Sequence, residues 1–222
     1  MTKKNASMPC VLLTGFNLFA GETINASWQA VNLLDDTLIA KHRIVAIALP
    51  CEFNRSLAVL LNAIEQHHPA LVLCVGQAGG RSEINIERVA INIDDARIAD
   101  NAGKQPIDCP VIADAPAAYF SNLPIKRMLI DLQQSHIPAA ISNSAGTYVC
   151  NHVMYGLLHH IALHEPQLKA GFVHIPYLPS QAVHHSGSAS MSEETVNNAL
   201  KVLITTALTA KQDVKVAAGT TH

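Results

Sequence analysis

The chain has 222 residues and a mass of 23.8 kDa, a size that suits one large domain. Hydrophobic residues make up 49% and charged residues only 14%, so the composition excludes a disordered chain and predicts a sizeable core. The formal charge of -2 comes with no cluster of lysine and arginine, and we therefore expect no nucleic-acid partner.

No apolar run approaches the roughly 18 residues that a membrane-spanning helix needs. The apolar stretch after the basic N-terminus covers only residues 11–13, which is too short for a secretion signal. The five cysteines form no CxxC pair, and their odd number leaves at least one thiol free. We therefore expect a cytoplasmic protein that does not bind membranes.

Apolar runs of strand length alternate with helical patterns along the chain. The runs predict strands at residues 10–14, 44–49, 70–75, 139–142 and 170–175. Apolar residues at spacings of three and four predict helices from Asn25, from Asn54, over 125–134, over 151–164 and over 192–208. This alternation predicts an α/β fold, a three-layer sandwich with a mostly parallel twisted sheet flanked by helices. We expect residues 1–222 to form a single domain with loose ends at 1–8 and 212–222.

Ligands of such sheets bind where the strands end at their carboxyl edge. The turns that follow the predicted strands are therefore the places to look for a site. They are residues 15–21, 76–81, 143–151 and 174–181.

Cys150 lies between a predicted strand and a predicted helix. A cysteine at a helix N-terminus meets unpaired backbone N–H groups and the positive end of the helix dipole, and both favour the thiolate. Such cysteines can have pKa values of roughly 3.5–7.5 and can act as nucleophiles. The alternative is a structural cysteine at the start of a core helix.

A nucleophilic thiol needs a base, and His174 is the best placed of the twelve histidines. It lies near the carboxyl end of an apolar run and just before Pro176, as either an active-site base or a satisfied core histidine. His160 and His164 have the spacing of a zinc pair on a helix, but the H-E-x-x-H arrangement is missing. We expect no metal site.

Glu87 interrupts an alternating apolar pattern. Apolar residues fall on even numbers at Ile84 and Ile86 and on odd numbers from Val89 to Ile93, so Glu87 shares the side expected to be buried. A buried carboxylate needs a partner. It either orients an imidazole or pairs with Arg88 or Arg97 at a sheet edge.

The turn at residues 76–81 has the sequence Gly-Gln-Ala-Gly-Gly-Arg. It matches neither a dinucleotide-binding fingerprint nor a phosphate-binding P-loop. Its glycines are equally well explained by a backbone that passes close to a small ligand.

Taken together, these segments resemble the pyroglutamyl peptidase I family, also called pyrrolidone-carboxylate peptidase, over about residues 10–208. The motifs that carry the resemblance are Thr14-Gly15-Phe16 with Phe19, Gly76-Gln77-Ala78-Gly79-Gly80-Arg81, Glu87-Arg88-Val89-Ala90-Ile91-Asn92, Asp95-Ala96-Arg97-Ile98, Ala145-Gly146-Thr147-Tyr148-Val149-Cys150-Asn151-His152 and Gly171-Phe172-Val173-His174-Ile175-Pro176-Tyr177.

The resemblance implies a cysteine peptidase of the omega-peptidase type, which removes an N-terminal pyroglutamyl residue and needs no cofactor. It implies a triad of Glu87, Cys150 and His174 that acts through a thioester. It also implies a homotetramer acting on peptides with an N-terminal pyroglutamate.

Other site residues follow from the same resemblance. Arg97, with the Cys150 N–H, is implied to hold the oxyanion. The residues implied to form the substrate pocket are Phe16, Phe19, Gln77 and Tyr148.

The chain departs from the family pattern near that pocket. Leu18 and Ala20 replace a proline and a glycine, Ala99 replaces a proline, and Tyr148 adds a hydroxyl where phenylalanine is common. These changes bear on the shape and mobility of the pocket loop.

Two other functions stay open on the sequence. One is a phosphorylase-type site in which Gly79, Gly80 and Arg81 hold a phosphate or nucleoside. The other is a binding module that keeps the fold and pocket but does not catalyse.

Overall fold

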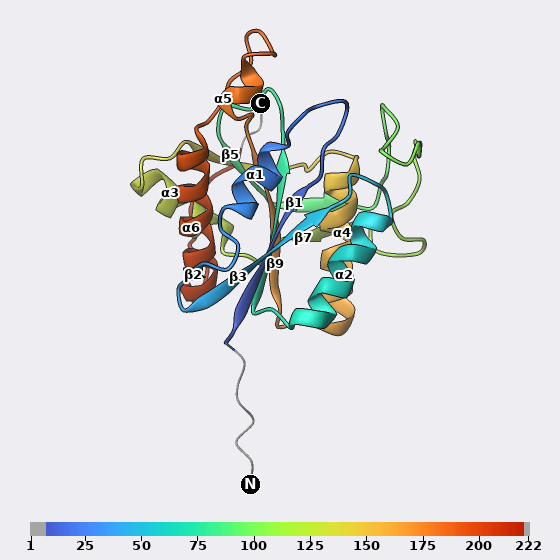
Figure 1. Cartoon of the computed structure of the whole chain (residues 1–222). Coiled ribbons are helices and arrows are strands. Elements are labelled where there is room, and N and C mark those ends of the chain that lie inside the picture. Colours follow the sequence, from blue (N-terminus) through green and yellow to red (C-terminus); the bar gives the residue numbers. More distant parts are fainter. Residues whose placement is uncertain (1–7, 220–222) are drawn as a thin grey trace.

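The computed structural model describes residues 8–219 and contains a seven-stranded sheet in the order β2-β3-β1-β4-β9-β5-β8 (Figure 1). A second, two-stranded sheet pairs β6 with β7. The strands are β1 (Cys10–Phe16), β2 (Leu38–Ile39), β3 (His42–Leu49), β4 (Leu71–Gln77), β5 (Ile84–Glu87), β6 (Val89–Ile91), β7 (Ala118–Phe120), β8 (Ala139–Ser142) and β9 (Lys169–Ile175).

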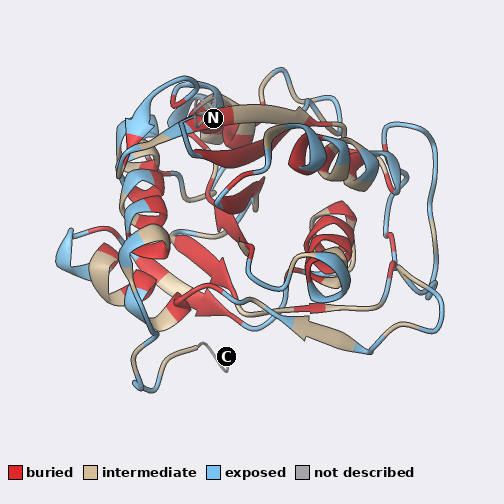
Figure 2. Ribbon diagram, turned by 90° about the horizontal axis from the view of Figure 1, so that it is seen from below, coloured by how far each residue is buried: buried red, intermediate tan, exposed pale blue. Residues whose placement is uncertain are grey.

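Helices cover both faces of the large sheet. The helices are α1 (Ala26–Asn32), α2 (Arg55–His67), α3 (Ile125–Gln134), α4 (Val149–His164), α5 (Pro179–Ala182) and α6 (Glu193–Thr209). α1, α3 and α6 pack on one face and form one apolar cluster with it, and α2 and α4 form a second cluster on the other face. Figure 2 shows buried residues in the sheet and on the helix sides that meet it. The predicted three-layer α/β fold is confirmed.

The sheet is mixed, although most of its pairings are parallel. β3, β1, β4 and β9 run parallel, whereas β5 is antiparallel to β9 and parallel to β8. The turn after β8 therefore does not start at the edge where β1, β4 and β9 end, contrary to the expectation for residues 143–151. Residues 143–148 instead carry the chain to the start of α4.

Several predicted elements have the expected bounds, and others differ at their ends. α3 and β8 begin and end where the sequence predicts. Asn25 and Ser192 cap α1 and α6 through side-chain oxygens. Asn54 precedes α2 with a φ of 64° and no side-chain cap bond, and α4 begins at Val149 rather than at residue 151.

The alternation around Glu87 has a different cause from the one the sequence suggests. The pattern changes because the chain leaves the large sheet after β5 and enters the small sheet at β6. In β6 the buried residue is Ala90, whereas Val89 and Ile91 are only half-buried. The reason given for the burial of Glu87 is therefore wrong, although its side chain is fully buried.

The tail after α6 makes contacts with the α3 region. The Asp213 carboxylate accepts hydrogen bonds from the backbone N–H groups of Lys126 and Arg127, and the Lys126 ammonium donates to the Ala218 carbonyl. Of the expected loose ends at 1–8 and 212–222, residues 1–7 and 220–222 lie outside the described residues. Within residues 8–219, no helix is long and apolar enough to cross a membrane.

Candidate active site

The register of three neighbouring strands places the candidate residues on one face of the sheet. His174 in β9 lies beside Gly76 in β4 and Asn85 in β5. Paired residues project to the same face, and so do residues two positions apart on a strand. Phe172 and Glu87 therefore share the face of His174, which is the face covered by α2 and α4.

His174 and Glu87 form a buried hydrogen-bonded pair. The imidazole Nδ1 lies 2.7 Å from the Glu87 Oε1, with the histidine 5% exposed and the glutamate fully buried. A carboxylate only accepts hydrogen bonds, so Nδ1 carries the proton. Nε2 of the neutral ring is then the atom that can accept a proton, as a general base requires.

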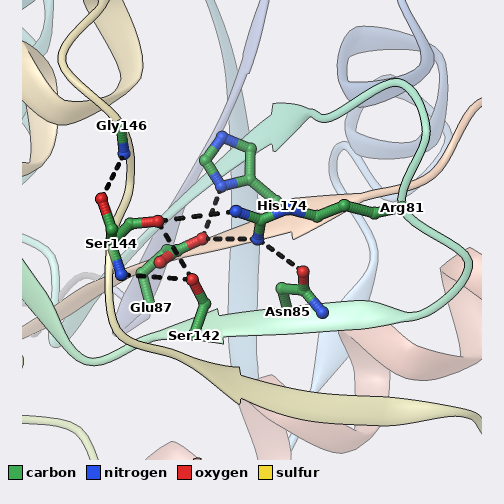
Figure 3. A network of polar contacts seen from close by, with 7 residues as sticks. All are labelled: Arg81, Asn85, Glu87, Ser142, Ser144, Gly146 and His174. Atoms are coloured by element: carbon green, nitrogen blue, oxygen red, sulfur yellow. Dashed lines mark hydrogen bonds and ion pairs between the residues drawn. The ribbon is translucent and has the colours of Figure 1, made fainter. Parts of the chain in front are cut away.

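Arg81 contacts the same Glu87 oxygen as His174 (Figure 3). Its Nη1 lies 3.0 Å from the same Glu87 Oε1 and also donates to the Asn85 side chain, while Nη2 reaches the Ser144 carbonyl at 3.5 Å. The sequence predicted Arg88 or Arg97 as the ion-pair partner of Glu87, and this prediction is wrong because the partner is Arg81. A sheet-edge pair is excluded too, because Glu87 lies between β9 and β8.

Sequence reasoning missed this role of Arg81. The arginine follows a glycine turn, and no periodic signal relates it to a strand that starts three residues later. The same contacts bear on the alternative of an anion site at residues 79–81. The guanidinium is turned inward to Glu87, and a Cβ at Gly79 would overlap the Tyr177 ring.

Cys150 lies in the first turn of α4, and its thiol is next to Gly76. A Cβ built on Gly76 would lie 3.0 Å from the Cys150 Sγ and 2.9 Å from the Phe172 ring. Because Gly76 is the cross-strand neighbour of His174, the missing side chain leaves room for the thiol beside the imidazole. The Cys150 N–H has no hydrogen-bond partner among the described residues, as expected in a first helical turn.

Burial opposes the ionisation that the helix N-terminus favours. Burial raises the pKa of the Cys150 thiol, and the nearby Cys51, Glu87 and Cys74 raise it further, whereas Arg81 lowers it. A charged thiolate loses hydration in such a site. The raised pKa favours the protonated thiol, so ionisation of Cys150 requires a base to take its proton.

A cavity of about 380 Å³ opens beside Cys150. It brings together Cys150, Arg97 and all four expected pocket residues. The residues that line it are Phe16, Phe19, Ala20, Glu22, Ile24, Asn25, Cys51, Gln77, Gly79, Arg97, Tyr148, Cys150 and Tyr177. Aromatic walls with a few polar groups suit a small, flat, neutral ligand.

Aromatic contacts shape the cavity wall. The rings of Phe19 and Tyr148 lie 5.4 Å apart between centroids, and Phe53 packs against Tyr148 edge-on at 5.2 Å. The Tyr148 hydroxyl donates to the Ala99 carbonyl at 3.1 Å. The extra hydroxyl thus fastens the segment that carries Arg97 to the start of α4.

The departures from the family pattern have structural consequences. Ala20 adopts a φ of 54°, which a glycine accepts without strain and an alanine does not. The Leu18 carbonyl accepts a hydrogen bond of 2.8 Å from Asn101. The pocket loop around Phe19 is therefore tied to the segment that follows Arg97.

Arg97 has a free guanidinium. Its side chain is exposed and makes no hydrogen bond or ion pair with any residue between 8 and 219 that the structure records, although it lines the cavity with Cys150. An unpaired cation at that place can stabilise negative charge that develops on a bound ligand.

His152 forms a second buried polar pair, two residues after Cys150. Its Nδ1 lies 2.8 Å from Asp94, and its Nε2 accepts from the Asn54 N–H at 3.0 Å. Both ring nitrogens are used inside the core, so this histidine fastens the segments around Asn54 and Asp94 to α4. No pattern in the sequence indicates this pair.

The other histidines form no metal centre in the described part of the chain. His160 and His164 have ring centroids 4.9 Å apart, and His160 lies 3.5 Å from Glu165. Over residues 8–219, no group of three or more His, Cys, Asp or Glu side chains is arranged to hold a metal ion.

Comparison with known proteins identifies the family. Residues 9–210 match the family described as "Pyroglutamyl peptidase". The pyrrolidone-carboxylate peptidase of Escherichia fergusonii is 55% identical over 97% of this chain and 100% of its own. The crystal structure of pyroglutamyl peptidase I from Bacillus amyloliquefaciens has a TM-score of 0.92 at 45% identity, covering 95% of this chain and all of that one. The pyrrolidone carboxyl peptidase from Thermococcus litoralis has a TM-score of 0.90 at 37% identity, with the same coverage. The chain therefore belongs to the pyroglutamyl peptidase family of cysteine peptidases.

Proposed function

We propose that this chain hydrolyses the amide bond after an N-terminal pyroglutamyl residue of a peptide and releases 5-oxoproline. One observation carries the proposal. The Cys150 thiol lies next to Gly76, the cross-strand neighbour of the histidine in the buried His174–Glu87 pair, and it lines an aromatic cavity. Nucleophile, base and orienting carboxylate are the parts of a triad.

The chemistry starts with proton transfer from Cys150 to the His174 Nε2. The sulfur attacks the acyl carbon of the pyroglutamyl group, and the carbonyl oxygen becomes an oxyanion. The Cys150 N–H and the Arg97 guanidinium hold this oxyanion. His174 returns the proton to the leaving amine as the C–N bond breaks, which leaves a thioester.

A water molecule then attacks the thioester and loses a proton to His174. The C–S bond breaks, 5-oxoproline leaves with the added oxygen, and the thiol regains the proton. Glu87 keeps Nδ1–H fixed throughout and offsets the charge of the imidazolium. The scheme uses no metal ion and no organic cofactor.

The substrate has to be recognised without a charged terminus. A pyroglutamyl cap has no free amine, so a flat slot between Phe16, Phe19 and Tyr148 holds the lactam ring, with Gln77 at the lactam. A prolyl ring has the same size but no lactam carbonyl, so a site that binds this carbonyl discriminates against proline.

The test measures release of 7-amino-4-methylcoumarin from its pyroglutamyl amide by wild type and by Cys150→Ala. We expect turnover by wild type and none by the variant, with nearly equal melting temperatures. No turnover by wild type, combined with alkylation of Cys150 no faster than a free thiol, would favour the non-catalytic binding module.

The cellular context and assembly stay predictions. All five cysteines carry free thiols, as a reducing cytoplasm permits. We further propose that the chain acts as one peptidase domain and assembles as a homotetramer, as the family resemblance implies. Light scattering after size-exclusion chromatography tests the tetramer, which a monomeric mass would contradict.

A further inference from the structure

The side-chain amide of Gln77 is held at its oxygen by two donors. Gln77 is the last residue of β4, and its Oε1 accepts from the Ala26 N–H at 2.8 Å and from the Gln181 Nε2 at 2.9 Å. Ala26 begins α1, where the backbone N–H groups have no intrahelical partner. A backbone N–H can only donate, so the atom that faces Ala26 has to be the oxygen of the Gln77 amide.

A second amide is fixed in the same way behind the first. Gln181 lies in the short helix α5 and is 2% exposed. Its Oε1 accepts from the Leu178 N–H at 3.2 Å, which leaves its Nε2 to donate to Gln77 and, at 3.4 Å, to the Ile24 carbonyl. Two backbone N–H groups thus set the polarity of both amides, and neither can be turned over without leaving a buried donor unpaired.

This arrangement leaves one polar atom of Gln77 unused. Its Nε2 has no partner among residues 8–219 and is not one of their buried unpaired side-chain atoms. Gln77 lines the cavity that Cys150 also lines. We propose that Gln181 is a positioning residue, which fixes the Gln77 amide so that its Nε2–H faces the cavity and donates to the lactam carbonyl of the substrate. The inference rests on the proposed function and adds how the lactam is distinguished from other rings.

The orientation of the Gln77 amide, which Gln181 fixes, predicts which substrate ring the cavity prefers. A pyroglutamyl ring offers a carbonyl to the Gln77 donor, whereas a prolyl ring offers an ammonium that the donor repels. In Gln77→Glu, one carboxylate oxygen can still accept from Ala26 and Gln181. The other oxygen takes the place of the Nε2 donor, so an acceptor faces the cavity. Gln77→Glu should therefore repel the lactam carbonyl and attract the prolyl ammonium.

The experiment compares wild type, Gln77→Glu, Gln181→Met and the exposed-site control Gln134→Met, which makes the same change as Gln181→Met on α3. Three quantities are measured for each protein: kcat and KM for the pyroglutamyl and prolyl coumarin amides, competitive inhibition by 2-pyrrolidone, and the rate of Cys150 alkylation by iodoacetamide. A site built to hydrogen-bond its substrate rejects an analogue that lacks the bonded group by about 10⁴–10⁵.

For Gln77→Glu we expect the pyroglutamyl-to-prolyl ratio of kcat/KM to fall by at least about 10². For Gln181→Met we expect a KM increase of roughly fivefold for the pyroglutamyl amide, because a neutral hydrogen bond contributes about 1 kcal/mol. Inhibition by 2-pyrrolidone should weaken by the same factor, while the alkylation rate and the control stay unchanged.

An unchanged ratio in Gln77→Glu, or a loss in Gln181→Met that appears equally in Cys150 alkylation, overturns the inference. These results are separate from failure of the proposed function, which would appear as absence of pyroglutamyl turnover in wild type.

Discussion

Arg81 and His174 bind the same carboxylate oxygen of Glu87, the arginine at 3.0 Å and the imidazole at 2.7 Å. The second oxygen, Oε2, is buried and has no partner among the described residues. Two donors on one oxygen leave the carboxylate with little freedom to rotate. They also place a cation at the same carboxylate oxygen that His174 contacts, so Arg81 can act on His174 through Glu87.

Replacement of Arg81 by methionine should lower turnover and shift the pH dependence of Cys150 alkylation. Loss of the cation raises the pKa of Cys150 further, so alkylation by iodoacetamide should move to higher pH. We expect a loss of roughly 10–10² in kcat/KM, since the triad itself remains.

Two further variants give the controls for Arg81. Arg81→Lys should retain the pH dependence of Cys150 alkylation, because it retains the charge that lowers the pKa of Cys150. Arg55→Met removes an exposed arginine that pairs with Glu52 and should change nothing. A pH profile of Arg81→Met that overlays wild type would show that Arg81 has only a structural role.

Glu87→Gln should move the same profile in the opposite direction. The amide keeps the size of the side chain but removes the charge, so it no longer offsets positive charge that forms on the imidazole during turnover. Glu87 also raises the pKa of Cys150, so alkylation should move to lower pH. Turnover should fall by roughly 10²–10⁴, the upper value being that of a serine triad with a neutral third member.

Glu83→Gln is the matched control for Glu87, since it neutralises a carboxylate four residues earlier, just before β5, and outside the proposed triad. It should leave rate and profile unchanged. If Glu87→Gln showed wild-type kinetics as well, a dyad of Cys150 and His174 would be the working unit.

The sequence predicted the alternation of strands and helices because apolar periodicity is local. It could not predict the direction of β5, since the reversal depends on which neighbour the strand pairs with. Glu87 was identified as buried on a faulty argument, because the pattern break marks a change of sheet. The contact between Arg81 and Glu87 escaped detection because it depends on how a glycine turn folds back over the sheet.

The hydrogen-bonded pair of Gln77 and Gln181 at the cavity was also beyond prediction from the sequence alone. Gln77 was found through family resemblance, whereas Gln181 lies in a short segment after Pro179 that has no periodic signal. Its role becomes visible only when α5 packs against the end of β4. Positions fixed by long-range hydrogen bonds between turns therefore need the folded structure.

Asp213 should stabilise the protein modestly through α3. The helix begins after Pro124 with no side-chain cap, and the Asp213 carboxylate accepts from its first N–H groups at 2.8 and 3.1 Å. A missing cap costs about 1 kcal/mol, and an exposed contact gives less. Asp213→Ala should therefore lower the free energy of unfolding by roughly 0.5–1 kcal/mol in urea titrations. Gln212→Ala is the neighbouring control, and equal stability of the two variants would show that the tail contact contributes nothing.

Gly76→Ala should impair the thiol without unfolding the protein. The φ of Gly76 is not in the left-handed region, so alanine fits the backbone and only the added methyl group matters. That group would lie 3.0 Å from the Cys150 Sγ and 2.9 Å from two atoms of the Phe172 ring, so the thiol has to move by a few tenths of an ångström or more. Displacement of a reacting atom by up to 1 Å can cost about 10² in rate.

We therefore expect kcat/KM of Gly76→Ala to fall by roughly 10–10², mostly in kcat, because the substrate cavity itself is retained. Gly156→Ala is the matched control on the same layer. Its methyl group would overlap the Leu57 side chain between α4 and α2, away from the thiol, so it should lower the melting temperature but leave turnover per folded molecule unchanged. If both alanines reduced stability and neither reduced turnover, the Cys150 thiol would not react from its place beside Gly76. If only Gly76→Ala slows the reaction, the empty position opposite His174 is what holds the nucleophile next to its base.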